Sequence, residues 1–203
     1  MSPLSPLGPD EALVGVTLNP VPMDHRPGCA DDIEVFVADE QSDDPIDPLR
    51  WSKLAHQVVV AQGVKGEAEL SLLFVDEAAI SELNQRFLGK TGPTDVLAFP
   101  IDEDVVLLGP RSADSLGPGP SPDVSPSDAP SLLGDVVICP AVARRNAPDH
   151  AGTYEDELAL LIVHGILHLL GMDHMESEEA EVMEAREREL LALFNAPAAG
   201  STQ

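Results

Sequence analysis

The segment His164-Gly-Ile-Leu-His168-Leu-Leu-Gly171-Met-Asp-His174 constrains the fold more than any other part of the 203-residue chain. His164 and His168 are four residues apart, so on a helix their side chains lie on one face, one turn apart. Gly171 has no Cβ and can take the left-handed conformation that ends a helix. The chain can then turn back and bring His174 towards the other two histidines. The sequence therefore predicts a helix followed by a tight turn, with three imidazoles grouped together.

Three neutral imidazoles at this spacing are a ligand set for zinc, and they leave the fourth tetrahedral position open for water, as in catalytic sites. The alternative is three unrelated helix histidines, each hydrogen-bonded or exposed. Three of the six histidines fall within eleven residues, with a helix-ending glycine between the last two, and this grouping favours a metal site. A closed structural zinc site usually has four protein ligands, mainly cysteines. We therefore predict one Zn²⁺ per chain, bound by His164, His168 and His174.

The metzincin proteases share this spacing in the pattern HExxHxxGxxH. Gly165 stands where that pattern has the glutamate that serves as general base. Without this proton acceptor, peptide hydrolysis at the metal is disfavoured. The sequence therefore makes a zincin-type metalloprotease a weaker hypothesis than another metallohydrolase.

The formal net charge of −25 argues against an extended, purely electrostatic grip on nucleic acid. Any RNA chemistry must then use a local basic patch, a metal or a partner. The two cysteines, Cys29 and Cys139, exclude a disulfide scaffold. Residues 1–10 do not resemble a signal peptide, and the apolar stretch 158–170 is too short and too polar to cross a bilayer. We expect a cytoplasmic protein that does not associate with membranes.

The pattern of apolar residues predicts one α+β domain over residues 32–195. Residues 1–31 are rich in Pro, Gly and Asp and are predicted to be a disordered N-terminal extension. Residues 102–131 have a similar composition and are predicted to be a flexible insertion between strands. Residues 196–203 are predicted to be a frayed tail.

Four strands and five helices are expected within this domain, with the sheet covered by helices. The predicted strands are 33–37, 70–75, 96–100 and 134–139. The predicted helices begin at Pro48, after Asp76, at Pro140, at Thr153 and at Glu176. In the second of these helices, Ile80, Leu83, Phe87 and Leu88 form the expected buried stripe, and in the last the buried side holds Met183, Leu190, Leu191 and Phe194.

With glycine at position 165, HGILHLLGMDH resembles the signature of the YbeY family. Two further segments are similar to that family: Leu83-Asn-Gln-Arg-Phe-Leu-Gly-Lys90 with Pro93-Thr-Asp-Val-Leu-Ala-Phe-Pro100, and Leu133-Gly-Asp-Val-Val-Ile-Cys-Pro140. The resemblance covers roughly residues 33–194 in the right order. It says nothing of the N-terminal extension or of the insertion.

The resemblance implies a zincin-like α+β fold and a zinc site in which His164, His168 and His174 are the ligands. It also implies a single-strand-specific endoribonuclease that matures the 3′ end of 16S ribosomal RNA and acts in ribosome quality control. Many members have an arginine two residues before the lysine of their GK motif, and Leu88 stands there in this chain. Arg86 is a weak candidate to replace it, because two residues rotate the side chain by about 200° around a helix.

Either a metal-bound water or the RNA 2′-hydroxyl can attack phosphorus, and the sequence leaves both open. Asp173, Thr94, Asp95, Asp135, Arg144 and Arg145 are further candidates near the expected site, each with a structural alternative as a turn, strand-end or exposed helix residue. A second hypothesis for the whole protein is a zinc-containing ribosome-assembly factor that binds ribosomal proteins or RNA with little nuclease turnover. The acidity of the chain and Leu88 favour this hypothesis more than they would for a typical nuclease.

Overall fold

The computed structural model describes residues 19–20, 33–101, 131–173 and 176–195. The predicted tail, nearly all of the predicted insertion and most of the N-terminal extension lie outside these ranges, as do His174 and Cys29. The described residues form a mixed sheet with strand order β1-β2-β3-β5-β4. The strands are β1 (Asn19–Pro20), β2 (Ile33–Asp39), β3 (Ala68–Phe74), β4 (Val96–Pro100) and β5 (Ser131–Ile138).

Four of these strands correspond to the predicted ones. The strands β2, β3 and β5 are parallel, and β4 runs antiparallel to β5 at one edge. The fifth strand, β1, was not predicted: its two residues pair antiparallel with β2 at the other edge. A two-residue pairing leaves no periodic pattern in the sequence, so hydropathy could not reveal it.

The helices are α1 (Pro48–Ala61), α2 (Glu77–Leu83), α3 (Pro140–Asn146), α4 (Tyr154–Leu169) and α5 (Ser177–Asn195). Their beginnings follow the predicted caps, since the side chains of Asp47, Asp76 and Thr153 each accept a hydrogen bond from a backbone N–H in the first turn. No helix among the described residues is both long and apolar enough to cross a membrane.

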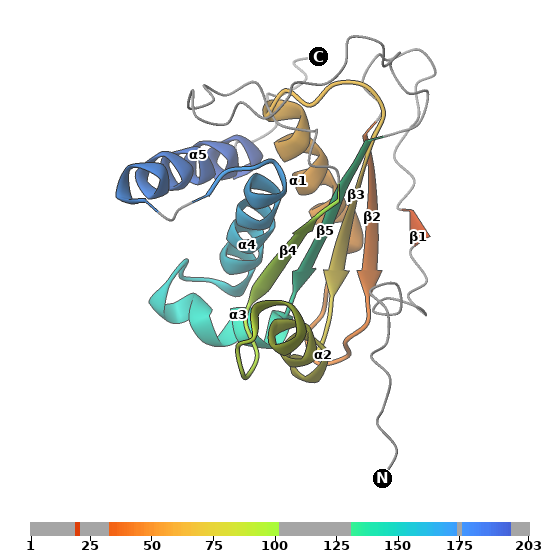
Figure 1. Ribbon diagram of the computed structural model, residues 1–203, viewed down its shortest axis with the longest axis vertical. Coiled ribbons are helices and arrows are strands. Elements are labelled where there is room, and N and C mark those ends of the chain that lie inside the picture. Colours follow the sequence, from red (N-terminus) through yellow and green to blue (C-terminus); the bar gives the residue numbers. More distant parts are fainter. Residues whose placement is uncertain (1–18, 21–32, 102–130, 174–175, 196–203) are drawn as a thin grey trace, which may run out of the picture.

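The main hydrophobic core lies between the sheet and the two helices α1 and α4, and α5 packs on the outer side of α4 (Figure 1). Leu54, Leu72, Ile162 and Ile166 are fully buried there. A smaller cluster on the opposite face of the sheet holds Ile80 of α2 with residues of β3, β4 and β5. The helix α4 is therefore the central helix of the protein, with β4 and β5 on one side and α5 on the other.

The predicted burial of the second helix was wrong at its C-terminal end. Ile80 is buried, but Phe87 and Leu88 are about half exposed, at 49% and 55%. Residues Asn84–Leu88 form a π-helical turn that follows α2 and ends at Gly89. Because a π-helical turn has more residues per turn than an α-helix, it rotates these two side chains off the buried stripe of α2. Both lie instead beside the functional site described below.

Candidate functional site

The helix α4 brings His164 and His168 together. Their Nε2 atoms lie 3.1 Å apart, and the two rings meet edge to face, with centroids 4.5 Å apart and an interplanar angle of 82°. Both side chains are partly exposed, whereas their neighbours Val163, Gly165 and Leu167 are buried. The predicted i, i+4 pair is thus formed on the open face of an otherwise buried helix.

The turn that ends α4 has the predicted geometry. Gly171 has a φ of +83°, which favours glycine, and its N–H donates to the carbonyl of His168. The N–H of Met172 donates to the carbonyl of Leu167, so the chain reverses at once after the helix. Asp173, an exposed residue, is the last one described before His174, which lies outside the described residues.

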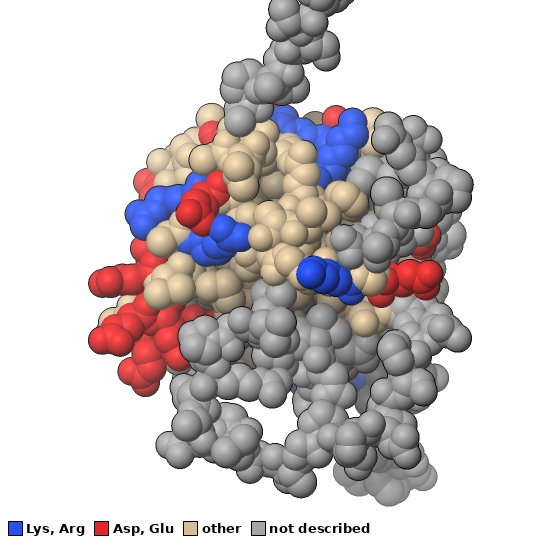
Figure 2. All heavy atoms as spheres, turned by 90° about the horizontal axis from the view of Figure 1, so that it is seen from above, with Lys and Arg blue, Asp and Glu red and all other residues tan. Residues whose placement is uncertain are grey.

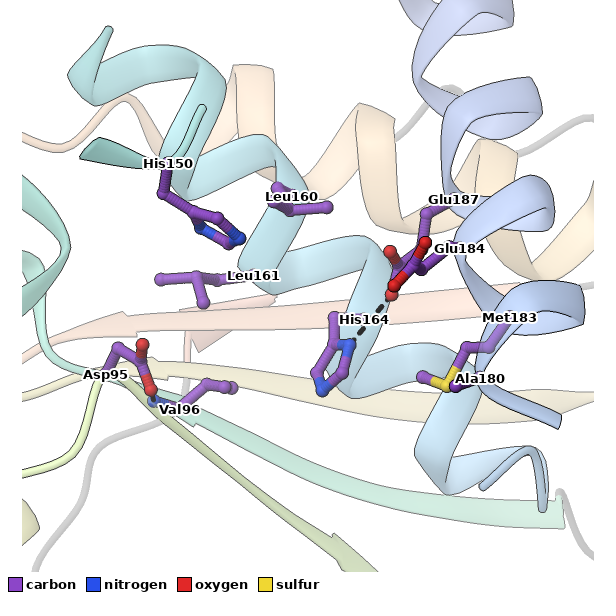
Figure 3. A pocket seen from close by; sticks show the side chains of 10 residues that line it. All are labelled: Asp95, Val96, His150, Leu160, Leu161, His164, Ala180, Met183, Glu184 and Glu187. Atoms are coloured by element: carbon purple, nitrogen blue, oxygen red, sulfur yellow. Dashed lines mark hydrogen bonds and ion pairs between the residues drawn. The ribbon is translucent and has the colours of Figure 1, made fainter. Parts of the chain in front are cut away.

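Glu187 of α5 fixes the orientation of the first histidine. Its Oε1 lies 2.7 Å from Nδ1 of His164, and the glutamate is only 8% exposed (Figure 3). A carboxylate at this distance holds the proton on Nδ1, so the lone pair of the ring is on Nε2, the nitrogen that faces His168. Glu187 was not predicted from the sequence. The residue could have been found from its position, because it lies between Met183 and Leu190 on the apolar stripe of an otherwise acidic helix.

The two histidines fit a zinc ion on geometric grounds. Zn–N bonds of about 2.0–2.1 Å at a tetrahedral angle separate two ligand nitrogens by about 3.3–3.4 Å. The observed 3.1 Å between the Nε2 atoms is close to that value. The part of the chain described by the structure holds no group of three or more His, Cys, Asp or Glu side chains placed for a metal. A metal held by these two histidines would take its remaining ligands from outside the described residues or from water.

A cleft lies between the edge strand β4 and the histidine pair. This β4 cleft, of about 670 Å³, is lined by Asn84, Leu88, Lys90, Thr91, residues 93–100, His164, Gly165 and His168. Because β4 is the last strand of the sheet, one edge of its backbone faces this open space without a neighbouring strand among the described residues. The cleft therefore extends from the edge of β4 to the two histidines.

A second, smaller hollow continues from the first. This histidine pocket, of about 260 Å³, shares Asp95, Val96 and His164 with the β4 cleft and extends to His150 on one side and to Ala180, Met183, Glu184 and Glu187 of α5 on the other (Figure 3). Leu160 and Leu161 of α4 form its apolar wall. The two hollows therefore adjoin, with His164 lining both of them and His168 lining the β4 cleft.

Asp95 stands where the two hollows meet. Its Oδ1 accepts hydrogen bonds from the backbone N–H of Val96 and from Thr94, and its Oδ2 accepts one from Asn146, at 3.2 Å. Its carbonyl accepts the N–H of Cys139. The predicted candidates Thr94 and Asp95 thus lie at the site, where these bonds anchor the start of β4 to α3.

His150 enters the histidine pocket on the side away from α5. Its Nδ1 lies 3.0 and 3.1 Å from the two carboxylate oxygens of Glu157, which is completely buried in α4. Glu157 also accepts the backbone N–H of Ala151. This hydrogen bond to Glu157 raises the pKa of His150 above its ordinary 6.5, and the charges of Asp95 and Glu187 add to the effect. His150 was not predicted from the sequence, because nothing in the pattern of residues around it links it to position 157.

Leu88 lines the β4 cleft, so the position at which many members of the resembled family have an arginine does lie at the site. The weak candidate Arg86 is absent from the described lining of either hollow, and its guanidinium lies over the ring of Phe87 at 5.4 Å. Phe87 in turn contacts Phe99 of β4, with ring centroids 4.9 Å apart. Arg86 therefore lies beside the β4 cleft, whereas Leu88 is part of its lining.

Three other candidates lie away from the histidines. Asp135 pairs with Ser71 and Phe99 in the sheet and points, with Val137, to the face opposite α4. Burial raises the pKa of Asp135. Arg144 forms an ion pair with Asp44 and lies over the Tyr154 ring, and Arg145 pairs with Glu77. These three residues serve the fold, in line with their structural alternatives.

Gly165 is required by packing. A Cβ at this position would lie 2.5 Å from Cγ1 of Val136, because α4 approaches β5 closely there. A glutamate at position 165, as in metzincins, would need the helix to move away from the sheet. The close packing of α4 on β5 therefore explains why this chain has glycine at position 165, where metzincins have their glutamate base.

Basic and acidic side chains occupy different parts of the surface. In the face shown in Figure 2, Lys and Arg side chains form small separate groups, and Asp and Glu side chains cluster at one side. Lys90 is the only Lys or Arg among the described residues that line the β4 cleft.

The fold and the pair of helix-borne histidines define a zincin-like α+β protein. The sequence profile of the family described as "Endoribonuclease YbeY" matches residues 36–195. An "Endoribonuclease YbeY" from Acidothermus cellulolyticus is 43% identical over 162 residues, which cover 80% of this chain and 92% of that protein. One from Frankia casuarinae is 42% identical over 161 residues, covering 79% of this chain and 74% of that protein. The chain belongs to the YbeY family.

Among solved structures, the solution structure of TM1509 from Thermotoga maritima aligns with 84% of this chain and 99% of its own, with a TM-score of 0.47 and 23% sequence identity.

Proposed function

We propose that this protein is a metal-dependent endoribonuclease that cleaves single-stranded RNA. The observation that carries the proposal is the 3.1 Å approach of the His164 and His168 Nε2 atoms in the cleft beside the edge strand β4. Membership of the YbeY family indicates the type of reaction, cleavage of RNA, because the relatives are named endoribonucleases. The proposed substrate is the precursor of 16S ribosomal RNA, cleaved near its 3′ end in the cytoplasm.

The proposed metal is one Zn²⁺ per chain, held by His164, His168 and His174. When bound, zinc supplies a Lewis acid that lowers the pKa of a coordinated water and offsets charge on phosphate oxygens. Glu187 holds His164 in the tautomer that can act as a ligand. The edge of β4 and the exposed side chains of Lys90 and Leu88 border the path along which a single strand would lie.

The test combines metal analysis with cleavage. Purified protein is expected to hold about one zinc, and to cleave a single-stranded oligoribonucleotide but not the same sequence in a duplex. His168→Ala should lose both zinc and cleavage, whereas the matched control His56→Ala, in α1, should keep both. Cleavage by His168→Ala at the wild-type rate, or retention of zinc by a His164→Ala/His168→Ala double variant, contradicts the proposal.

A second candidate function is ribosome assembly through binding, with little turnover. The acidity of the chain, with a net charge of −25, and the presence of Leu88 in the cleft favour it, since both weaken a grip on RNA phosphates. Basic ribosomal proteins are then the expected partners. In a strain lacking the gene, unprocessed 16S 3′ ends restored only by wild type support the nuclease. Restoration by His168→Ala at equal protein level supports the assembly factor, and normal ends in the deletion strain exclude both.

A further inference from the structure

The histidine pocket contains an imidazole that the metal site does not use. His150 follows a 3₁₀ turn, Ala147–Asp149, and its backbone angles, φ −126° and ψ −90°, lie outside the common regions. The ring lines the same pocket as His164 and Asp95, and it comes from a different segment (Figure 3). A residue held in an uncommon backbone conformation at a pocket is a candidate for a role in function.

The contacts of the ring assign its two nitrogens different tasks. Nδ1 is held between both oxygens of Glu157, at 3.0 and 3.1 Å, so the Nδ1 proton is committed to that carboxylate. The carboxylate is completely buried, and it also accepts the N–H of Ala151. Nε2 is left as the atom of the ring that can reach a substrate. The His150 side chain is 60% exposed, so Nε2 can also exchange protons with solvent.

The position of this imidazole fits a phosphate group between it and the histidine pair. Glu157 and His164 are seven residues apart on α4, so they lie on the same face, about 10 Å apart along the axis. A pocket of about 260 Å³ lies over that interval, with Leu160 and Leu161 at its wall. This pocket has room for a phosphodiester between His164 and His150, both of which line it.

We propose that His150 is the general acid of the reaction, its Nε2–H donating to the 5′ oxygen that leaves phosphorus; this rests on the proposed endoribonuclease function. The nucleophile, a water or the 2′-hydroxyl, forms its bond to phosphorus and releases its proton to solvent. The bond between phosphorus and O5′ breaks, and its electron pair stays on O5′. That oxygen takes the proton from Nε2, and the neutral imidazole regains a proton from solvent.

The charges around the ring support this assignment. Glu157 of α4, Asp95 before β4, and Glu187 of α5 all raise the pKa of His150, with the hydrogen bond to Glu157 as the largest cause. Glu184 of α5 lines the same pocket and adds negative charge. The raised pKa extends to higher pH the range in which His150 is an imidazolium, which is the form a general acid needs before it reacts. Glu157 acts through His150 and is a positioning residue.

The experiment compares two substrates with the zinc-loaded, full-length protein. The first is a single-stranded oligoribonucleotide whose cleavage position has been mapped. The second carries sulfur in place of the bridging 5′ oxygen at that position. A thiolate leaves without a proton, since a thiol has a pKa of about 8.5, whereas an alkoxide needs one. Single-turnover rates are measured for wild type, His150→Ala, His150→Asn and the control Glu155→Gln, an exposed carboxylate in the same helical turn as Glu157.

The proposal expects His150→Ala to slow cleavage of the oxygen substrate by about 10²–10⁴-fold, the usual range for a general acid. On the sulfur substrate the same variant should match wild type within a factor of about three. His150→Asn keeps a donor for Glu157 and should behave in the same way, which separates proton donation from folding. An equal loss on both substrates, or no loss on the oxygen substrate, overturns the proposal. Failure of the wild type itself to cleave either RNA would instead reject the proposed function.

Discussion

Oε1 of Glu187 lies 2.7 Å from Nδ1 of His164 and connects α5 to the central helix α4 across 23 positions of the sequence. The glutamate is 8% exposed, and it lies on the apolar side of α5 between Met183 and Leu190. Burial of a carboxylate at this position destabilises the folded protein unless the carboxylate has a hydrogen-bonding or charged partner. The contact therefore orients the histidine and also fixes how the last helix docks.

We predict that Glu187→Gln weakens zinc binding. A glutamine cannot accept the Nδ1 proton as strongly as a carboxylate, so His164 becomes a poorer ligand, and affinity should fall by about 10–100-fold. Competition with a zinc chelator measures this. Glu184→Gln is the matched control, since Glu184 lies one turn earlier on the same helix and lines the same pocket. Equal zinc affinity of Glu187→Gln and wild type would show that the contact serves helix docking alone.

The close approach of α4 to β5 predicts an unusual cost for a small substitution. Gly165→Ala would normally favour a helix by about 1 kcal/mol. Here the new Cβ meets Val136 Cγ1 at 2.5 Å, and overpacking of a core costs about 1–3 kcal/mol. We expect the variant to be less stable than wild type in urea denaturation.

The double variant Gly165→Ala/Val136→Ala tests the cause. Removal of the two Val136 methyl groups makes room for the alanine, so the two substitutions together should destabilise less than the sum of the single effects. If the two changes in the free energy of unfolding simply add, contact with Val136 is not the reason why Gly165→Ala is destabilising.

Arg186 links the outer helix to α1. Its Nε donates to Oε1 of Gln62 at 2.7 Å, and its Nη2 donates to the carbonyl of Ala61 at 2.8 Å, at the C-terminal end of α1. Hydrogen bonds from charged donors are worth about 1.5–3 kcal/mol when buried, and less at this partly exposed site. We expect Arg186→Ala to lower the free energy of unfolding, while exposed Arg188→Ala should have little effect. Urea titrations of both variants measure the free energy of unfolding. Equal losses in the two variants would argue against a stabilising link from Arg186 to α1.

The His150–Glu157 pair predicts a pH dependence of stability with a definite sign. The folded-state pKa of His150 is raised above 6.5, mainly by Glu157. The folded protein therefore binds more protons than the unfolded chain in this range, and the stabilisation is complete below about pH 6.5. It is lost as the pH rises through the folded-state pKa.

The stability difference between wild type and His150→Asn should accordingly shrink as the pH is raised from 6 to 9. Nuclear magnetic resonance titration of the His150 ring should report a pKa above 6.5. The pKa should drop in Glu157→Gln, but not in the control Glu155→Gln. A ring that titrates at or below its ordinary value would contradict the pairing.

The sequence predicted those parts of the site that depend on local spacing. The i, i+4 pair of histidines and the left-handed Gly171 are properties of one helix and its end, and both are present. Glu187 and His150 were missed because their roles depend on tertiary contacts, with α5 docked on α4 and with a buried Glu157. Asp135 was considered for the site, but strand alternation places it on the other face of the sheet.

The fold was predicted to a similar degree. Four strands and five helices follow from hydrophobic periodicity and caps, with strand and helix bounds that differ by a few residues, such as the start of β5 at Ser131. The exposure of Phe87 and Leu88 could not be predicted, because an α-helical period was assumed through a π-helical turn. The predicted disorder of residues 1–31 and the predicted insertion stay predictions, apart from the pairing of Asn19–Pro20.

The segment between β4 and β5 connects two neighbouring strands of the sheet. The two strands are antiparallel, with Pro100 opposite Gly134, and the N–H of Ile101 donates to the carbonyl of Leu133. The chain therefore leaves β4 next to the point where it enters β5, so a short connection is enough. We expect replacement of residues 105–130 by a short Gly/Ser linker to preserve the fold, because the free energy of loop closure depends only weakly on length. Circular dichroism and thermal unfolding measure this, and zinc content reports the site. A cooperative loss of structure in the shortened protein would show that the replaced residues contribute to the packed domain.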